Sequence, residues 1–127
     1  MKVKEIVEKL NERQKKTVRK CIENCGLPEL EAEVEAEVPT DVIEFLKVIA
    51  NPLRFKILKM TRDHWLCVCL LAQVLEADQT LISHHLRTLK RLNLVEERRE
   101  GRMHFYRARR DVIENYLKKV GVELLGE

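Results

Sequence analysis

Four cysteines stand in two close pairs, and they are the residues of this chain best suited to do chemistry. One pair is Cys21 and Cys25, and the other is Cys67 and Cys69. Because no apolar run is long enough to cross a bilayer and the N-terminus lacks a signal-peptide hydrophobic region, we expect a cytoplasmic protein whose thiols stay reduced. In such a compartment, close cysteine pairs favour metal ligation or redox sensing over structural disulfides.

The spacing within each pair determines how its two sulfurs can meet one ion. Cys21 and Cys25 are four residues apart in a helical pattern, so both thiolates can face the same ion. Cys67 and Cys69 are two residues apart, and at about 100° per residue an ideal helix would point them away from each other. We therefore expect the start of their helix to unwind or distort if both bind one ion. Sulfur ligands alone select soft or borderline ions, namely zinc, cadmium, lead, copper(I) or arsenite.

Other roles for the thiols stay open on the sequence alone. Cys67 and Cys69 could be small buried apolar residues, the thiols could form a redox switch, or they could hold a constitutive structural zinc. Metal sensing is our main hypothesis, and a thiol-redox regulator is the alternative.

A second set of functional side chains lies on residues 77–95. Apolar residues recur there at spacings of four and three, which is typical of an amphipathic helix; they are Ile82, Leu86, Leu89 and Leu92. Asp78 can cap the start of this helix, and Asn93 tolerates the left-handed conformation at its end. The opposite face carries hydrogen-bond donors and positive charge without an acid; its residues are Gln79, Thr80, Ser83, His84, Arg87, Thr88, Lys90 and Arg91. Since a helix of about 14 residues fits a DNA major groove about 12 Å wide, we predict a recognition helix, with His85 packed and hydrogen-bonded on its inner side.

Charge is divided unevenly along the chain. The protein has 127 residues and a formal net charge of +3, whereas residues 79–110 alone carry +6 and residues 26–44 carry −7 without a single base. This asymmetry favours a polyanion-binding region next to a region that stays away from polyanions. A merely solvated charged surface is the alternative, and the coincidence of the basic region with the predicted recognition helix argues against it.

The other elements predict a helical domain with an N-terminal extension. Residues 1–25 are expected to form a helical arm that ends at Gly26 and Pro28, and residues 26–38 an acidic linker. Residues 39–127 are expected to form the DNA-binding and dimerisation domain. Helices are predicted over 39–50, 52–62 and 65–76, and the last of these leads by a short turn into the recognition helix, as in a helix-turn-helix.

After Asn93 the pattern changes to that of two short strands. They cover residues 94–99 and 103–107, and Gly101 in the intervening turn can supply the positive φ of a tight hairpin. The tip of this β-wing carries candidate phosphate or minor-groove contacts at Arg98, Arg99 and Arg102, with His104 nearby; the alternative is that these exposed arginines only make the hairpin soluble. Asp111 is expected to cap a final helix that ends or frays at Gly121. The predicted fold class is thus mainly α with a small β-hairpin, a winged helix-turn-helix with an extra N-terminal helix.

Several motifs stand in a specific order within a stretch of roughly 39–120. They are ANPLRFKIL at 50–58, LCVC at 66–69, SHHLRTL at 83–89, EGR at 100–102 and Tyr106. In these motifs the sequence resembles the ArsR/SmtB family of metal-responsive winged-helix repressors. The resemblance implies a homodimer built on the first and last helices of the domain. It also implies an operator of double-stranded DNA held by the recognition helices and wings, and release of that operator when metal binds.

The cysteine pattern resembles the cadmium- and lead-sensing CadC branch of that family. In that branch an N-terminal cysteine pair from one protomer completes a site on the other, which implies a shared site of Cys21, Cys25, Cys67 and Cys69. Two positions depart from the family pattern: Leu70 stands where an acid is usual, and Asn93 where a glycine usually ends the recognition helix. The first departure bears on the sensory role, and neither alters the expected fold.

Two further classes of function were weighed against a DNA-binding repressor. The chain could be a winged-helix module that binds only protein, which would show no steep dependence of DNA affinity on salt. An enzyme has little support, because no nucleophile–base pair and no phosphate-cradling glycine loop are present in the sequence. We therefore expect a cytoplasmic, non-membrane, DNA-binding transcriptional repressor.

Overall fold

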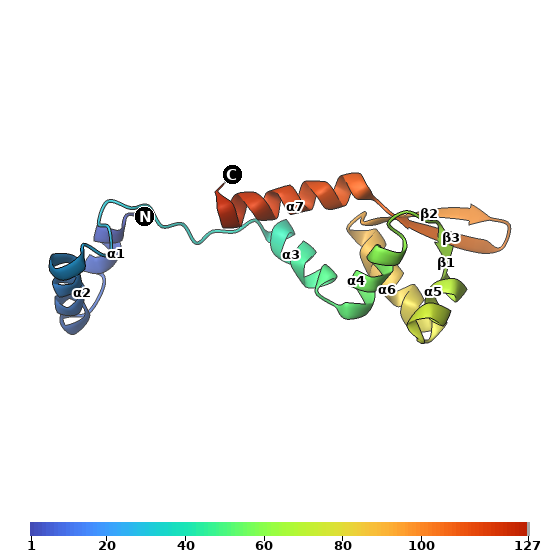
Figure 1. Ribbon diagram of the computed structural model, residues 1–127, viewed down its shortest axis with the longest axis horizontal. Helices are drawn as coiled ribbons and strands as arrows, with labels where there is room; N and C mark the ends of the chain where they lie inside the picture. Colours follow the sequence, from blue (N-terminus) through green and yellow to red (C-terminus); the bar gives the residue numbers. More distant parts are fainter. Residues whose placement is uncertain (127) are drawn as a thin grey trace. The chain divides into compact units, whose positions relative to one another are not determined.

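The computed structural model describes residues 1–126, which divide into two compact units. The first unit runs from Met1 to Glu37, and the second begins at Val38 (Figure 1). Among the described residues, no helix has both the length and the apolar character needed to cross a membrane.

The first unit contains two short helices, α1 (Val3–Glu8) and α2 (Glu12–Cys25), where the sequence predicted one. The single-helix prediction was wrong because Asn11 begins a new helix. Its side chain accepts a hydrogen bond from the backbone N–H of Gln14, whose own side chain accepts from the Asn11 N–H, a reciprocal capping box. Gly26 ends α2 in the left-handed conformation, as predicted.

The acidic segment after α2 folds back on the N-terminus for part of its length. The backbone N–H of Val3 donates to the carbonyl of Ala32 at 3.0 Å, and Glu31 accepts ion pairs from both Lys2 and Lys4 at 2.9 Å. Val7 is the only buried hydrophobic residue in this unit. One buried valine removes little apolar surface from water, so the unit has no extensive core of its own.

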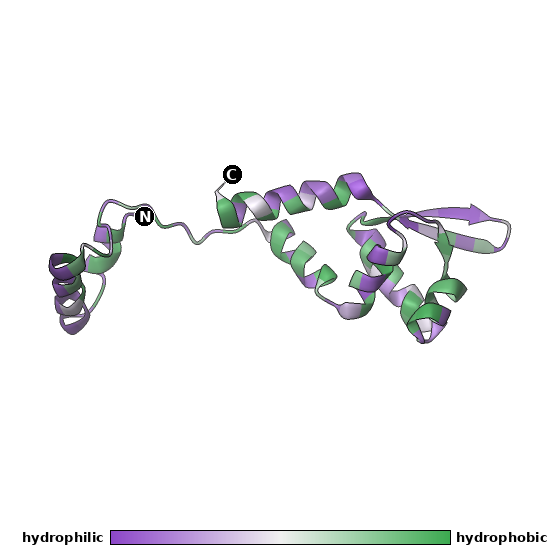
Figure 2. Ribbon diagram, in the orientation of Figure 1, coloured by the Kyte–Doolittle hydropathy of each residue, from purple (hydrophilic) through white to green (hydrophobic). Residues whose placement is uncertain are grey.

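The second unit is a winged helix-turn-helix, and the predicted fold class is confirmed. Its elements are α3 (Thr40–Ile49), α4 (Pro52–Met60), β1 (Leu66–Cys67), α5 (Val68–Leu75), α6 (Gln79–Arg91), β2 (Val95–Glu100), β3 (Met103–Ala108) and α7 (Arg110–Leu125). The strands form an antiparallel sheet in the order β1-β3-β2. Figure 2 shows hydrophilic residues along most of β2 and hydrophobic residues along most of α5. The wing therefore faces solvent, and α5 contributes to the interior.

The core of this unit lies between the helices and the root of the wing. Its largest fully buried side chains include Phe45, Ile57, Leu71, Ile82, Leu86, Leu89 and Leu94. The ring of Phe45 on α3 stacks on that of Tyr116 on α7, with centroids 4.6 Å apart and planes 5° from parallel. Beside this stack, Lys119 pairs with Asp41 at 2.8 Å, so α3 and α7 are held together at two points.

Two details of the second unit differ from the sequence predictions. The final helix does not end at Gly121 but continues to Leu125, with the left-handed Gly126 after it. The predicted helix over residues 65–76 begins only at Val68, because the two preceding residues form β1 and pair with β3. The second difference changes the geometry of the cysteines.

Candidate DNA interface and thiol site

The ends of α6 are determined by the residues that the sequence singled out. The carboxylate of Asp78 accepts from the backbone N–H of Thr80 at 2.8 Å, and Asn93 has a left-handed φ of 59°. The turn between α5 and α6 uses a second left-handed residue, Glu76, with a φ of 50°. These three positions orient α6 against the core and leave its other side in solvent.

Most of the predicted contact residues of α6 are exposed. They are Gln79, Thr80, His84, Arg87, Lys90 and Arg91, with Ser83 half-buried. Thr88 was placed on this face wrongly. Its side chain is buried, with an exposed fraction of 7%, and its hydroxyl donates to the carbonyl of His84 at 3.3 Å. A β-branched residue that bonds back to its own helix at this position packs toward the core, so Thr88 supports α6 from inside.

His85 faces the interior, as predicted, and ties α6 to α4. Its Nδ1 accepts a hydrogen bond from Nε of Arg54 at 3.1 Å, and Nη1 of Arg54 also donates to the carbonyl of Val48 at 3.4 Å. Burial lowers the pKa of His85, and the nearby charges of Arg54 and His84 lower it further. The imidazole is therefore neutral at pH 7, which leaves Nδ1 free to accept.

The wing carries the three predicted arginines on its exposed strands and turn. Arg98 pairs with Glu100 at 2.7 Å, whereas Arg99 and Arg102 have no ion pair within residues 1–126. Gly101 has a φ of 60° and supplies the positive φ expected of the turn. Of the three predicted arginines, Arg99 and Arg102 thus have no acidic partner that a phosphate would have to replace.

A polar cluster that was not predicted from the sequence lies where the wing meets α6. The carboxylate of Glu97 on β2 accepts from the hydroxyl of Tyr106 on β3 at 2.7 Å and pairs with Lys90 on α6 at 3.4 Å. Burial, followed by this hydrogen bond and the negative charge, raises the pKa of Tyr106 to about 12. Glu97 and Tyr106 lie directly opposite each other in the β2–β3 register, so counting outward from the predicted turn could have found the pair.

Cys67 and Cys69 lie close together without any distortion of a helix. Their sulfurs are 3.1 Å apart. Cys67 has an extended backbone in β1 and forms the N-cap of α5, while Cys69 lies in the first turn of that helix. The expectation that the helix must unwind before both sulfurs can meet one ion was therefore wrong, because the helix starts after Cys67.

The two thiols of this pair are unequal. Cys67 is 4% exposed, and Cys69 is exposed. Burial alone would raise the pKa of Cys67, but the hydrogen bond from Cys69 and nearby backbone N–H groups outweigh burial and lower it. The same hydrogen bond to Cys67 raises the pKa of Cys69. Cys67 therefore gives up its proton more readily than Cys69, and the two sulfurs lie close enough for a soft metal ion to replace the proton between them.

Cys21 and Cys25 lie in the last two turns of α2, in the first unit. Both are exposed, and the thiol of Cys25 donates to the carbonyl of Cys21 at 3.1 Å. Within residues 1–126, no group of three or more histidine, cysteine or acidic side chains is arranged to hold a metal ion. Each cysteine pair therefore supplies two sulfur ligands and would need further ligands to complete a tetrahedral site.

The second unit is the DNA-binding domain of a winged helix-turn-helix transcriptional regulator. Its defining features are a recognition helix after a tight turn, a basic β-wing, and a three-stranded sheet that is buried where it meets the helices. Residues 51–97 match the family model described as "Bacterial regulatory protein, arsR family". The chain belongs to the arsR family, whose members are DNA-binding transcriptional regulators and not enzymes.

Individual relatives agree with this assignment. The chain is 36% identical over 78 residues to the uncharacterized HTH-type transcriptional regulator MJ1325 of Methanocaldococcus jannaschii, covering 61% of this chain and 88% of that protein. It is 36% identical over 69 residues to a cadmium resistance transcriptional regulatory protein CadC homolog of Staphylococcus aureus, covering 54% of this chain and 57% of that relative. A solved structure of the homodimeric winged helix-turn-helix DNA-binding domain Mb0332 from Mycobacterium bovis matches with a TM-score of 0.55 and 28% identity, covering 74% of this chain and 94% of that one.

Proposed function

We propose that this regulator is a homodimeric repressor that binds a pseudo-palindromic DNA operator and releases it when a thiophilic metal ion binds its cysteines. The observation that carries the metal response is the 3.1 Å separation of the Cys67 and Cys69 sulfurs at the start of α5, the helix directly before the recognition helix. Metal binding at this pair would alter the structure at the N-terminus of α5, which is one of the two helices of the helix-turn-helix.

The exposed side of α6 supports the DNA contact. We propose that Gln79, Thr80, Ser83, His84 and Arg87 contact base edges or nearby phosphates, and that Lys90, Arg91 and the wing arginines Arg98, Arg99 and Arg102 contact the backbone. Thr88 is left out because it is buried. Arg87 is the central cation of this surface, since one helical turn on either side of it lie His84 and Arg91.

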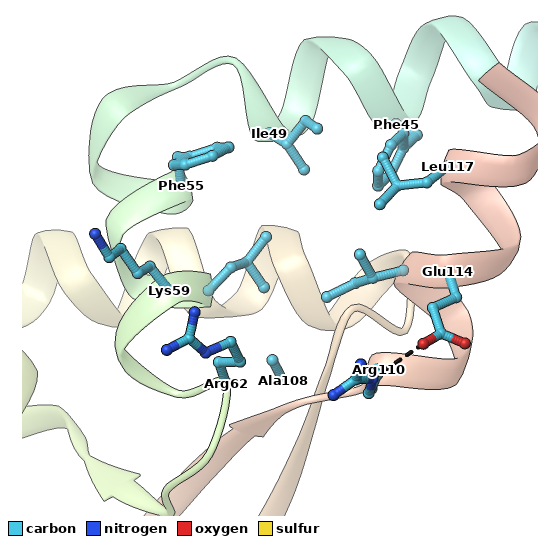
Figure 3. A pocket seen from close by; sticks show the side chains of 11 residues that line it. Phe45, Ile49, Phe55, Lys59, Arg62, Ala108, Arg110, Glu114 and Leu117 are labelled. Atoms are coloured by element: carbon cyan, nitrogen blue, oxygen red, sulfur yellow. Dashed lines mark hydrogen bonds and ion pairs between the residues drawn. The ribbon is translucent and has the colours of Figure 1, made fainter. Parts of the chain in front are cut away.

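An apolar surface between α3, α4 and α7 supports the dimer. A cavity of about 550 Å³ opens there, lined among others by Phe45, Ile49, Phe55 and Leu117 (Figure 3). Phe55 and Leu117 are more than half exposed, and further along α7 Leu124 and Leu125 are exposed as well. Because exposed apolar surface of this extent favours association, we propose that a second copy of the chain covers it, which gives the two recognition helices that a pseudo-palindrome requires.

The chemistry of the four thiols supports a soft or borderline ion as the effector. Cadmium, lead and zinc accept four thiolates, and arsenite and copper(I) accept fewer. We propose that Cys67 and Cys69 provide two ligands and that Cys21 and Cys25, from the same or the other chain, provide two more. Four thiolates around a divalent ion leave a charge of about −2, which disfavours a bound polyanion nearby. Reduced thiols are required, and a cytoplasmic location supplies them.

The experiment is a titration of the reduced protein with labelled operator DNA, with and without each ion. We expect tight, salt-dependent binding that cadmium weakens, together with a thiolate charge-transfer absorption band. Arg87→Ala should weaken operator binding about tenfold, whereas Arg13→Ala, which removes an exposed charge from the first unit, should not. Equal affinity of Arg87→Ala and the parent would exclude the proposed docking, and cadmium binding without loss of DNA would exclude the release mechanism.

The same 3.1 Å separation favours a second candidate, a thiol-redox regulator. A peroxide can oxidise one thiolate to a sulfenic acid with loss of water or alcohol, and the second thiol then displaces water to form the disulfide. The two cysteines lose two electrons and two protons in total, and the peroxide is reduced. Loss of operator binding on adding peroxide, but not on adding any soft ion to the reduced protein, would identify this second function.

A further inference from the structure

The carboxylate of Glu97 joins three elements of the DNA-binding side. Its Oε2 accepts from the hydroxyl of Tyr106 at 2.7 Å and also lies 3.4 Å from Nζ of Lys90, while its Oε1 lies 3.4 Å from Nδ1 of His104. Glu97 comes from β2, Tyr106 and His104 from β3, and Lys90 from the last turn of α6. Tyr106 and Lys90 thus share one oxygen atom.

The position of this carboxylate is unusual for a DNA-binding surface. The side chain of Lys90, which lies next to Arg87 and Arg91 on α6, is 52% exposed, while the side chain of Glu97 is 25% exposed. The hydrogen bond from Tyr106 is the main reason that the pKa of Glu97 is lowered, so this carboxylate is ionised at neutral pH. Lys90 therefore has two competing anionic partners, Glu97 within the protein and a phosphate of the DNA.

The two distances to Oε2 indicate which donor holds the oxygen more tightly. A length of 2.7 Å is typical of a strong O–H···O⁻ hydrogen bond, whereas 3.4 Å is beyond the usual range for N–H···O contacts. A half-exposed lysine in such a long ion pair loses little free energy when it leaves. The ring of Tyr106 is partly buried against the core, which holds the hydroxyl in place.

We propose that Tyr106 is a positioning residue for DNA binding, whose hydroxyl occupies the Glu97 carboxylate and so leaves Lys90 free to contact a phosphate. This inference rests on the proposed DNA-binding function. Without the hydroxyl, the ionised Glu97 would be left with His104 at Oε1 and Lys90 at Oε2. Because the hydroxyl and Lys90 share Oε2, the lysine would then pair with that oxygen more closely. The surface would then present one cation fewer to the duplex.

The test is a set of operator titrations with four variants. Tyr106→Phe keeps the packed ring and removes only the hydroxyl, and we expect it to weaken operator binding on the order of fivefold and to lower the salt dependence by about one phosphate contact. The double variant Tyr106→Phe/Glu97→Gln also removes the negative charge that competes with the DNA for Lys90. It should restore both the affinity and the salt dependence to at least the parent values. In a Lys90→Ala background, Tyr106→Phe should have no further effect. The fourth variant, Lys90→Ala alone, provides the reference for that comparison.

The outcomes separate this inference from a purely structural role and from the function on which it rests. If the hydroxyl only stabilises the sheet, Glu97→Gln will not rescue Tyr106→Phe, and the proposal is wrong. It is also wrong if Tyr106→Phe binds operator like the parent, or still weakens binding in the Lys90→Ala background. Thermal unfolding of each variant checks that the sheet is intact. Failure of the parent itself to bind any duplex would instead reject the DNA-binding function.

Discussion

The two cysteine pairs of this protein differ in what holds them. Cys67 and Cys69 lie at a strand–helix junction of the second unit, where backbone pairing with β3 and the packing of α5 bring the sulfurs to 3.1 Å. Cys21 and Cys25 lie exposed at the end of α2, in a unit with one buried hydrophobic residue. The first pair is preorganised by the fold, whereas the second would lose conformational freedom in the proposed binding of an ion. Two cysteine pairs that look alike in the sequence therefore differ in how firmly the fold holds them in place.

The largest expected effect concerns the cores on which the two pairs depend. Phe45→Ala removes a fully buried ring stacked on Tyr116 and should lower the free energy of unfolding of the second unit by about 3–5 kcal/mol. Val7→Ala should leave that unfolding transition unchanged. Urea unfolding followed by the fluorescence of Trp65, the single tryptophan and a residue of the second unit, measures this difference. A shift of the Trp65 transition by Val7→Ala comparable to that by Phe45→Ala would mean that the two units unfold together.

A smaller effect is expected when each pair is removed. Cys67→Ser/Cys69→Ser should lower the affinity of the reduced protein for cadmium more than about 100-fold, whereas Cys21→Ser/Cys25→Ser should lower it only about tenfold. The reason is that the preorganised pair binds with less loss of entropy. Competition with a chelating dye measures both values. The reverse order would show that the exposed pair, and not the buried junction, is the principal binding site.

The smallest effect concerns the link between α4 and α6. Because the pKa of His85 is lowered from its usual 6.5, the unfolded chain takes up a proton more readily than the folded one. The stability that His85 contributes is therefore present above pH 6.5 and is lost progressively as the pH falls below it. His85→Asn, which keeps an acceptor for Arg54, should reduce the slope of stability against pH between about 6.5 and 5. His84→Asn, at the exposed neighbour, is the matched control, and an equal change in both variants would contradict this assignment.

Chemistry local to the chain made much of the second unit predictable. The start of α6 at Asp78, the left-handed residue Asn93 after it and the turn at Gly101 each depend on only a few neighbouring residues. All three positions adopt the expected conformation. The inward position of His85 followed from its place beside the apolar stripe of α6. Local capping would also have revealed the break in the N-terminal arm, since Asn11 and Gln14 have the spacing of a capping box.

The errors arose where a distant residue determines the local structure. Residues 66–75 are almost continuously apolar, so their periodicity does not distinguish a helix from a helix preceded by a strand. Leu66 and Cys67 are extended because Tyr106 and Phe105, about 40 residues later, pair with them. The hydrogen bond between Arg54 and His85 likewise joins two residues that are 31 positions apart in the sequence. The short distance between the two sulfurs therefore could not be predicted from the positions of the cysteines in the sequence alone.

Under the proposed metal response, the two-residue strand β1 has a consequence for how selectivity among ions would change. Phe105 is the register partner of Cys67, although no cysteine lies near it in the sequence. A substitution at Phe105 that alters side-chain volume would shift the backbone of Cys67, and with it the bite distance between the two sulfurs. A preference of the proposed site for a larger or smaller ion would in this way be adjusted from the hairpin, while all four proposed cysteine ligands remain the same.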